Sequence, residues 1–286
     1  MRYARRLSSV EALRPSTYAD RRALYELVRD ALLAARVTEP EVARRLAMVS
    51  VHHLEGRGGR VLLRSTDAGE IGLIRAFVEL VDLPMAEVNA GMLAEMNWTG
   101  SDLGFFLGQL YTNLSLEYSP TAVPTIAEHA CVFVHSLDSV RIPGTYTSVD
   151  ATRSHREGQQ QSLAALCAGD SIPVATGQGP GRTWRGDSAL VIVAGRFDGL
   201  PAGRPEVDDM IGWGLLPSLA RALAGFSFLE LPPASAAHTE RSVRDGVRLL
   251  RQRFLEFGFH LEVTDQAIRY VRLSTTYHPE KGERGF

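Results

Sequence analysis

The sequence predicts an α/β fold in which a parallel sheet domain is followed by a small helical domain. Strands without polar alternation, such as residues 130–135 and 189–194, are separated by segments with helical spacing. A parallel sheet that helices cover on both faces has this pattern. In addition, residues 61–77 read as an apolar strand, a short loop with two glycines and an apolar helix start. A phosphate-binding loop occupies this kind of context.

Helices and strands are expected to alternate along the chain. Residues 19–35 and 39–54 have apolar positions at helical spacing. We then expect strands over residues 61–65, 85–89, 130–135 and 189–194, and helices over residues 70–81, 102–112 and 157–167. Residues 171–187 contain a Gly/Pro-rich stretch and are expected to form a loop. Further helices are expected over residues 233–256 and 264–274.

This order of elements divides the chain into three parts. We expect N-terminal helices over residues 1–58, a large α/β domain over residues 59–232 and a small helical lid domain over residues 233–286.

Composition excludes several classes of protein. Among 286 residues, 45% are apolar and 22% charged, which is ordinary for a soluble globular chain. No apolar run approaches the roughly 18 residues that span a membrane, and the basic N-terminus lacks the apolar core of a secretory signal. A net charge of −2 gives no electrostatic reason to bind nucleic acid. We therefore expect a cytoplasmic protein that binds neither nucleic acid nor membranes.

The cysteines and histidines do not indicate a metal site. Cys131 falls in an expected buried strand and Cys167 at a helix end, so both are interpreted as core residues. His52, His53 and His155 lack the spacing of metal ligands. Lysine is nearly absent from the 31 basic residues, which we interpret as the codon bias of a bacterium with a high-GC genome.

The loop after the first strand has lost the residues that bind phosphate. The phosphate-binding pattern is Gly-x-x-x-x-Gly-Lys-Ser/Thr, and its eight positions correspond here to residues 65–72. Ser65 stands at the first glycine and Glu70 at the second. Ile71 stands at the lysine, and Gly72 at the hydroxyl residue that binds magnesium. An unrelated strand–turn–helix is the alternative interpretation of this segment.

Charge in the loop also opposes phosphate binding. Gly69 remains as a loop glycine, but Asp67 and Glu70 add negative charge where the phosphates would lie. Like charges a few ångströms apart repel by several kcal/mol at an effective dielectric near 20. We expect a collapsed loop in which Asp67 or Glu70 accepts hydrogen bonds from the N–H groups that begin the next helix.

The strand over residues 130–135 shows a second loss. In a P-loop ATPase the buried apolar run ends in Asp-Glu, of which the Asp holds Mg²⁺ and the Glu orients the attacking water. Here the run Cys-Val-Phe-Val is followed by His135 and Ser136. Neutral imidazole is a poor ligand for a hard cation. Neighbours on a strand point to opposite faces, so we expect no nucleophile–base pair at these two positions.

The sequence around these strands resembles that of one family, the AAA+ protein unfoldase ClpX. Residues 37–54 are similar to its segment VIGQEQAKKVLAVAVYNH. Further similar segments follow in the same order at residues 80–84, 154–166, 189–200, 206–217, 255–268 and 281–286. The resemblance covers roughly residues 30–286. It implies an AAA+ P-loop-type sheet domain, here with degenerate Walker A and Walker B motifs, followed by a helical lid domain that is shorter than in the family.

The resemblance also implies roles for residues outside the two motifs. Trp98, Thr99 and Gly100 stand where the family has the pore loop Gly-Tyr-Val-Gly, whose aromatic grips a threaded polypeptide. Packing of Trp98 within its own domain is the alternative. Arg284 matches the lid arginine. The family's arginine-finger position is Ala222 here.

The segment between residues 200 and 206 is too short for the family's ClpP-docking tripeptide. The sequence thus favours a catalytically inactive ClpX-like pseudo-ATPase with no cofactor. It would act as a scaffold, a regulator or a partner of a protein client or another AAA+ subunit, without forming a stable hexamer alone. The alternative is an ATP-dependent unfoldase or chaperone subunit in a mixed ring with active neighbours, in which ATP and Mg²⁺ would be cofactors. A third class is an enzyme with a new activity in the old cleft, for which we identify no catalytic residues.

Overall fold

The computed structural model describes residues 18–34, 40–53, 56, 58–65, 69–95, 103–142, 150–174, 182–231, 248, 251, 254–255, 260–264 and 266. Contacts divide the chain into two compact units. The first comprises Met1–Arg64 and Leu73–Glu230, and the second comprises Ser65–Gly72 and Leu231–Phe286. The first unit holds nearly all of the described helices and strands.

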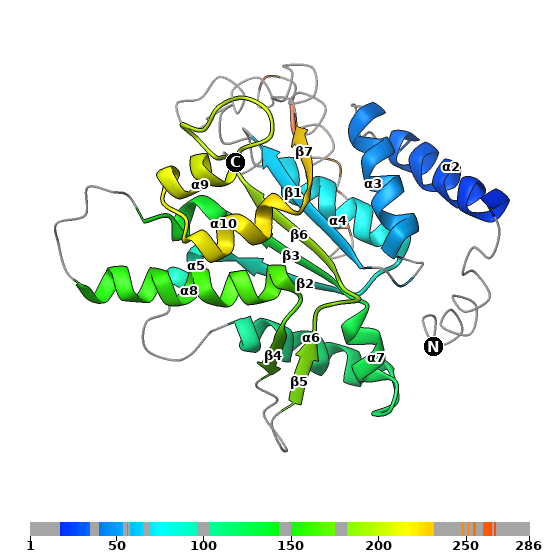
Figure 1. Cartoon of the computed structure of the whole chain (residues 1–286). Coiled ribbons are helices and arrows are strands. Elements are labelled where there is room, and N and C mark those ends of the chain that lie inside the picture. Colours follow the sequence, from blue (N-terminus) through cyan, green and yellow to red (C-terminus); the bar gives the residue numbers. More distant parts are fainter. Residues whose placement is uncertain are drawn as a thin grey trace. The chain divides into compact units, whose positions relative to one another are not determined.

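A five-stranded parallel sheet forms the centre of the first unit (Figure 1). Its strand order is β2 (Met85–Asn89), β3 (Cys131–His135), β6 (Leu190–Gly195), β1 (Gly59–Ser65) and β7 (Ser227–Leu231). The pairs β2–β3, β3–β6 and β6–β1 are parallel, and Leu190 lies opposite both Cys131 and Gly59. The predicted α/β fold with a parallel sheet is therefore confirmed. β7 is a strand that the sequence did not predict.

Helices precede and connect the strands in the order that the sequence suggests. They are α2 (Tyr18–Ala34), α3 (Pro40–His52), α4 (Gly69–Val81), α5 (Ala90–Glu95), α6 (Leu103–Glu117), α7 (Val123–Glu128), α8 (Asp150–Ala168), α9 (Val207–Trp213) and α10 (Pro217–Ala224). A short 3-10 helix, η2 (Leu137–Val140), follows β3 directly. In the described part of the chain, every helix is too short or too polar to cross a bilayer. The helices predicted over 233–256 and 264–274 lie almost wholly outside the described residues.

Residues 171–187 form a hairpin instead of the predicted loop. β4 (Ser171–Val174) and β5 (Arg182–Arg185) pair antiparallel, with Ile172 opposite Trp184. Trp184 is fully buried, and its indole N–H donates to the carbonyl oxygen of Ala127 at 2.8 Å. The loop prediction was wrong because the Gly/Pro-rich stretch hides two strands of only four residues each.

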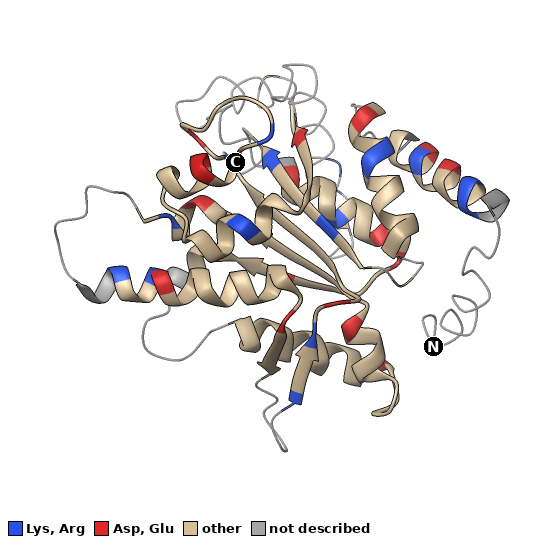
Figure 2. Cartoon of the chain, viewed as in Figure 1, with Lys and Arg blue, Asp and Glu red and all other residues tan. Residues whose placement is uncertain are grey.

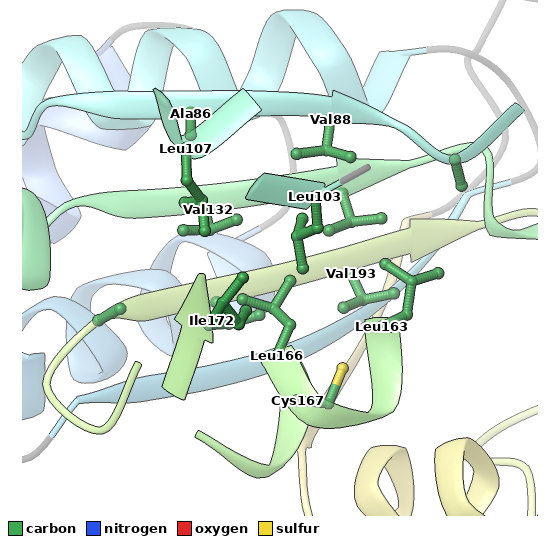
Figure 3. Packing of buried hydrophobic residues seen from close by; sticks show 14 of the residues in the cluster. Ala86, Val88, Leu103, Leu107, Val132, Leu163, Leu166, Cys167, Ile172 and Val193 are labelled. Atoms are coloured by element: carbon green, nitrogen blue, oxygen red, sulfur yellow. The ribbon is translucent and has the colours of Figure 1, made fainter. Parts of the chain in front are cut away.

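One face of the sheet packs against α6 and α8 (Figure 3). Buried aliphatic side chains of β2, β3 and β6 meet buried leucines of these two helices; they are Ala86, Val88, Val132 and Val193 on the sheet, and Leu103, Leu107, Leu163 and Leu166 on the helices. Each valine or leucine among them contributes about 1.5–3 kcal/mol when it is fully buried. β3 and β6 are buried at every residue, which means that their other face is covered as well.

Gly214 supplies a backbone conformation that the junction after α9 requires. It ends α9 with φ of 115° and ψ of 23°, and its carbonyl oxygen accepts a hydrogen bond from the N–H of Ile142 at 2.9 Å. A methyl group at this position would overlap with the carbonyl oxygen of Ile142. The turn therefore depends on glycine for both its φ angle and its close backbone approach.

We expect Gly214→Ala to lower the free energy of unfolding by about 2 kcal/mol or more, because the left-handed conformation and the overlap both oppose a side chain. Gly212→Ala is the matched control, since Gly212 lies in the same helix with open space around it. The control should be neutral or gain up to about 1 kcal/mol, because alanine favours a helix over glycine. Urea unfolding of both variants measures the difference, and equal losses would contradict the assignment.

Candidate functional site

The carboxyl ends of β2 and β3 bring polar side chains together in the first unit. β3 ends at His135, which lies opposite Asn89 at the end of β2. Glu87 lies two residues earlier on β2, opposite Phe133. Because both strands are parallel and in this register, Glu87, Asn89, Phe133 and His135 share one face of the sheet. Open α/β sheets bind their ligands at this edge.

His135 is buried and is held by a carboxylate from the neighbouring strand. Its Nε2 atom lies 3.4 Å from Oε1 of Glu87, and its side chain is 7% exposed. Its ring lies 5.5 Å from that of Phe133, centroid to centroid. His135 is the residue that the sequence analysis aligned with a magnesium-binding aspartate. In the structure its imidazole is in contact with a protein carboxylate.

Glu87 is in turn paired with an arginine of α4. The Nε and Nη2 atoms of Arg75 donate to the two carboxylate oxygens of Glu87, each at 2.9 Å. Such two-pronged pairs are among the stronger charge-assisted hydrogen bonds. The hydrogen bond to Glu87 raises the pKa of Arg75, so that the guanidinium stays charged. The pair Arg75–Glu87 therefore carries no net charge beside His135.

These residues do not fit a magnesium ion. Mg²⁺ needs carboxylate oxygens in octahedral geometry, but the carboxylate of Glu87 is neutralised by Arg75 and contacted by His135. Among the described residues no group of three or more His, Cys, Asp or Glu side chains could hold a metal ion.

Ser136 departs from the sequence expectation. It lies just after β3 with φ of 61° and ψ of 40°, a left-handed conformation, and begins η2. Because the chain turns here, its side chain does not alternate to the opposite face, and its Oγ atom lies 3.1 Å from Nδ1 of His135. The expectation that these neighbours point apart was wrong, since it assumed that the strand continues through Ser136.

Two sets of contacts hold the turn at Ser136. The carbonyl oxygen of Ser136 accepts hydrogen bonds from both the N–H and the hydroxyl of Ser139, at 3.0 and 2.7 Å. The carboxylate of Asp138 accepts the backbone N–H groups of Arg196 and Phe197, each at 2.8 Å. The first set closes η2, and the second ties it to the end of β6. The left-handed residue is thus fixed from both sides.

The structure describes only part of the loop that the sequence predicts to be a degenerate phosphate loop. β1 ends at Ser65, which is buried, and residues 66–68, including Asp67, lie outside the described residues. The remaining predicted positions begin α4: Gly69 opens the helix, Glu70 is a buried acidic residue of its first turn, Ile71 is half-buried and Gly72 is exposed. That Asp67 or Glu70 accepts hydrogen bonds from the N–H groups at the start of α4 stays a prediction.

Other predicted site residues divide between described and undescribed parts of the chain. Trp98, Thr99, Gly100 and Arg284 lie outside the described residues. On α10, Arg221 is exposed and Ala222 is half-buried against the core. The finger position in α10 therefore presents a methyl group.

Sequence reasoning missed Arg75 and Glu87. Both are charged residues in otherwise apolar segments, since Arg75 interrupts the apolar start of α4 and Glu87 is the only charged residue of β2. A lone charge on a half-buried strand favours a nearby partner, and this signal could have identified Glu87 from the sequence.

Comparisons with known proteins support a distant relationship. No family model matches the chain. It is 29% identical over 149 residues to the ATP-dependent Clp protease ATP-binding subunit ClpX of Bacteroides thetaiotaomicron and of Bacteroides fragilis. The match covers 49% of this chain and 34% of each relative, so the matched region spans about a third of the relatives' length. The similarity supports a relationship to ClpX and the AAA+ proteins at a distant level, with which the α/β fold is consistent.

We expect His135→Asp to be less stable than His135→Asn by about 1–2 kcal/mol, because a second carboxylate would then lie at the same buried edge as Glu87. The two variants differ in charge and hardly in size. In a Glu87→Gln background the difference between them should disappear. Urea unfolding of the four proteins measures this coupling, and equal stability of the two single variants would contradict the geometry.

Proposed function

We propose that the protein is a ClpX-like AAA+ protein that does not hydrolyse ATP and that works by binding another protein, as a scaffold or regulator. The observation that carries the proposal is the state of His135. This residue stands at the position of the magnesium-binding aspartate, and its imidazole is engaged by Glu87, whose charge is balanced by Arg75.

The predicted phosphate-binding loop also lacks the side chains that would bind phosphate and magnesium. Ile71 and Gly72 stand at the lysine and hydroxyl positions, and they provide neither positive charge nor a metal ligand. Glu70 adds a buried carboxylate to the first turn of α4, where an anionic ligand would need the helix's N–H groups. Any one of these differences is compatible with some nucleotide binding, but together they remove the motif side chains that would bind phosphate and magnesium.

Two features support a role in protein binding. Trp98 keeps a large aromatic side chain in the segment that resembles a pore loop, and tryptophan is strongly enriched among residues that dominate binding energy. The helix that follows in the sequence, α6, bears no charged residue before its last residue, Glu117, and is otherwise drawn in the colour of uncharged residues in Figure 2. Its outer surface exposes Phe105 and Leu116, the latter 82% exposed. An uncharged apolar surface of this kind suits contact with another protein.

The relationship to ClpX supports one second function. A subunit without its own ATPase chemistry could work in a mixed ring with active neighbours. The arginine-finger position is Ala222, and the arginine next to it is Arg221, which is exposed on α10. Binding to an active AAA+ protein, followed by nucleotide hydrolysis in the mixture, would favour this function over a separate scaffold.

We expect no measurable ATPase rate and an affinity for ATP or ADP weaker than about 1 mM, because neither lysine, hydroxyl, aspartate nor glutamate of the two motifs is present. Isothermal titration with Mg²⁺ and each nucleotide, and a coupled phosphate-release assay, measure this directly. A ClpX protein measured in parallel serves as the positive control. Micromolar affinity for ATP would overturn the proposal.

We expect Trp98→Ala to weaken binding to the partner by roughly tenfold or more, or about 1.4 kcal/mol, while the fold stays intact. The partner is first identified by pull-down and mass spectrometry, and affinity is then measured with purified components. Trp184→Ala is the matched control, because Trp184 is fully buried and its truncation should cost about 3–5 kcal/mol of stability. Lower stability of Trp98→Ala with unchanged partner affinity would assign Trp98 to the core.

A further inference from the structure

We infer that Ser136, His135 and Glu87 form an activated serine nucleophile that accepts a short acyl group from an activated oxyester or thioester. This activity is independent of nucleotide and of the proposed protein-binding function. It rests on a side-chain arrangement in which a hydroxyl, an imidazole and a carboxylate follow one another in contact at the carboxyl edge of the sheet.

The distances join the three groups in the order that nucleophilic catalysis needs. Ser136 Oγ lies 3.1 Å from Nδ1 of His135, and Nε2 of the same ring lies 3.4 Å from Oε1 of Glu87. A proton on Nε2 faces the carboxylate, which leaves Nδ1 as the acceptor for the serine hydroxyl. A nucleophile next to a base that is oriented by a third group is the general signature of this chemistry.

The backbone at Ser136 supports a role for its side chain. A left-handed conformation costs a residue other than glycine roughly 1–2 kcal/mol, and such outliers persist where the surroundings enforce them and gather at functional sites. Here Ser139 and Asp138 enforce the turn through four hydrogen bonds. The turn follows a buried strand and precedes a helical segment, so that it presents the half-buried Ser136 hydroxyl at the end of β3.

Arg75 and Glu87 act as positioning residues for the histidine. The two hydrogen bonds from Arg75 fix the carboxylate plane of Glu87, and Glu87 then selects the tautomer of His135. Phe133, on the same strand as His135, contributes an aromatic neighbour and no charge. Glu87 and Arg75 are thus the charged groups that the structure places on the imidazole side of the pair.

The reaction step is balanced without a cofactor. Oγ of Ser136 attacks the acyl carbon while its proton passes to Nδ1 of His135. The bond from the acyl carbon to the leaving oxygen or sulfur breaks, and the leaving group takes the proton from the imidazolium. Water then attacks the acyl-serine with His135 as the base, and it releases the carboxylic acid.

A fluorophosphonate reagent tests the nucleophile, since Oγ displaces fluoride from phosphorus and the serine is left with a stable mass increment. We expect the full-length protein to be labelled at Ser136, as located by tandem mass spectrometry. Ser136→Gly removes the hydroxyl while suiting the left-handed backbone, so this variant should unfold at the same or a higher temperature and show no label. Ser162→Ala, at a serine near the surface of α8, should leave labelling unchanged.

Variants of the base and its partner separate catalysis from structure. His135→Asn should fold and lose about a hundredfold or more in labelling rate, which is the smaller end of the effect of a general base. Glu87→Gln should lower the pH of half-maximal labelling, because loss of the carboxylate disfavours the protonated imidazole. Hydrolysis of p-nitrophenyl acetate should follow the same order among the variants.

Absence of label at Ser136, or an equal rate in folded His135→Asn, would overturn the inference. The nucleotide titrations described above are separate measurements. Micromolar ATP affinity would overturn the proposed function and would not affect the serine inference. Absence of label at Ser136 would overturn the serine inference and would not affect the proposed function.

Discussion

Burial of the central strands on both faces is the constraint on which the rest of the structure depends. Every residue of β3 and β6 is buried, so these strands carry apolar side chains until they end. His135 is the one exception, and it lies at the last position of β3. A buried polar group without a partner costs about 1–3 kcal/mol, so the imidazole requires contacts within the sheet. Glu87 and Ser136 supply them, and Arg75 then balances the charge of Glu87. One polar residue in a buried strand therefore accounts for contacts among four residues.

A second buried polar side chain links this edge to the helices that follow. Gln160 of α8 is fully buried, and its amide nitrogen donates to the carbonyl oxygens of Val140 and Gly214. Its amide oxygen accepts the backbone N–H of Leu216. One side chain thus forms hydrogen bonds with backbone groups at the end of η2, in the turn after α9 and just before α10. Because a buried amide must be fully paired to be tolerated, these three segments are held in a single arrangement around the end of β3.

Sequence reasoning predicted the sheet well and the site only in part, for physical reasons. β2, β3 and β6 are short apolar segments bounded by turns, which identify strands without knowledge of their neighbours. β4, β5 and β7 are short and only half-buried, and their identity depends on pairing and on the tertiary contacts of Trp184. His135 was recognised because its position in a motif is local. Its contact with Glu87 depends on the register of two strands 48 positions apart in the sequence, and its contact with Ser136 on a backbone angle that propensities do not specify.

The electrostatic balance of the edge supports the proposal that the protein lacks ATPase chemistry despite its distant similarity to ClpX. A nucleotide site of that class sets phosphates and carboxylates against a lysine and a divalent cation. In this chain Arg75 and Glu87 neutralise each other through two hydrogen bonds, and His135 adds an imidazole in place of a carboxylate. The edge has reached neutrality with its own side chains, and it has no excess of charge for a metal–phosphate complex to offset. The same edge places Nδ1 of His135 beside the hydroxyl of Ser136, an arrangement that requires neither a metal nor a phosphate.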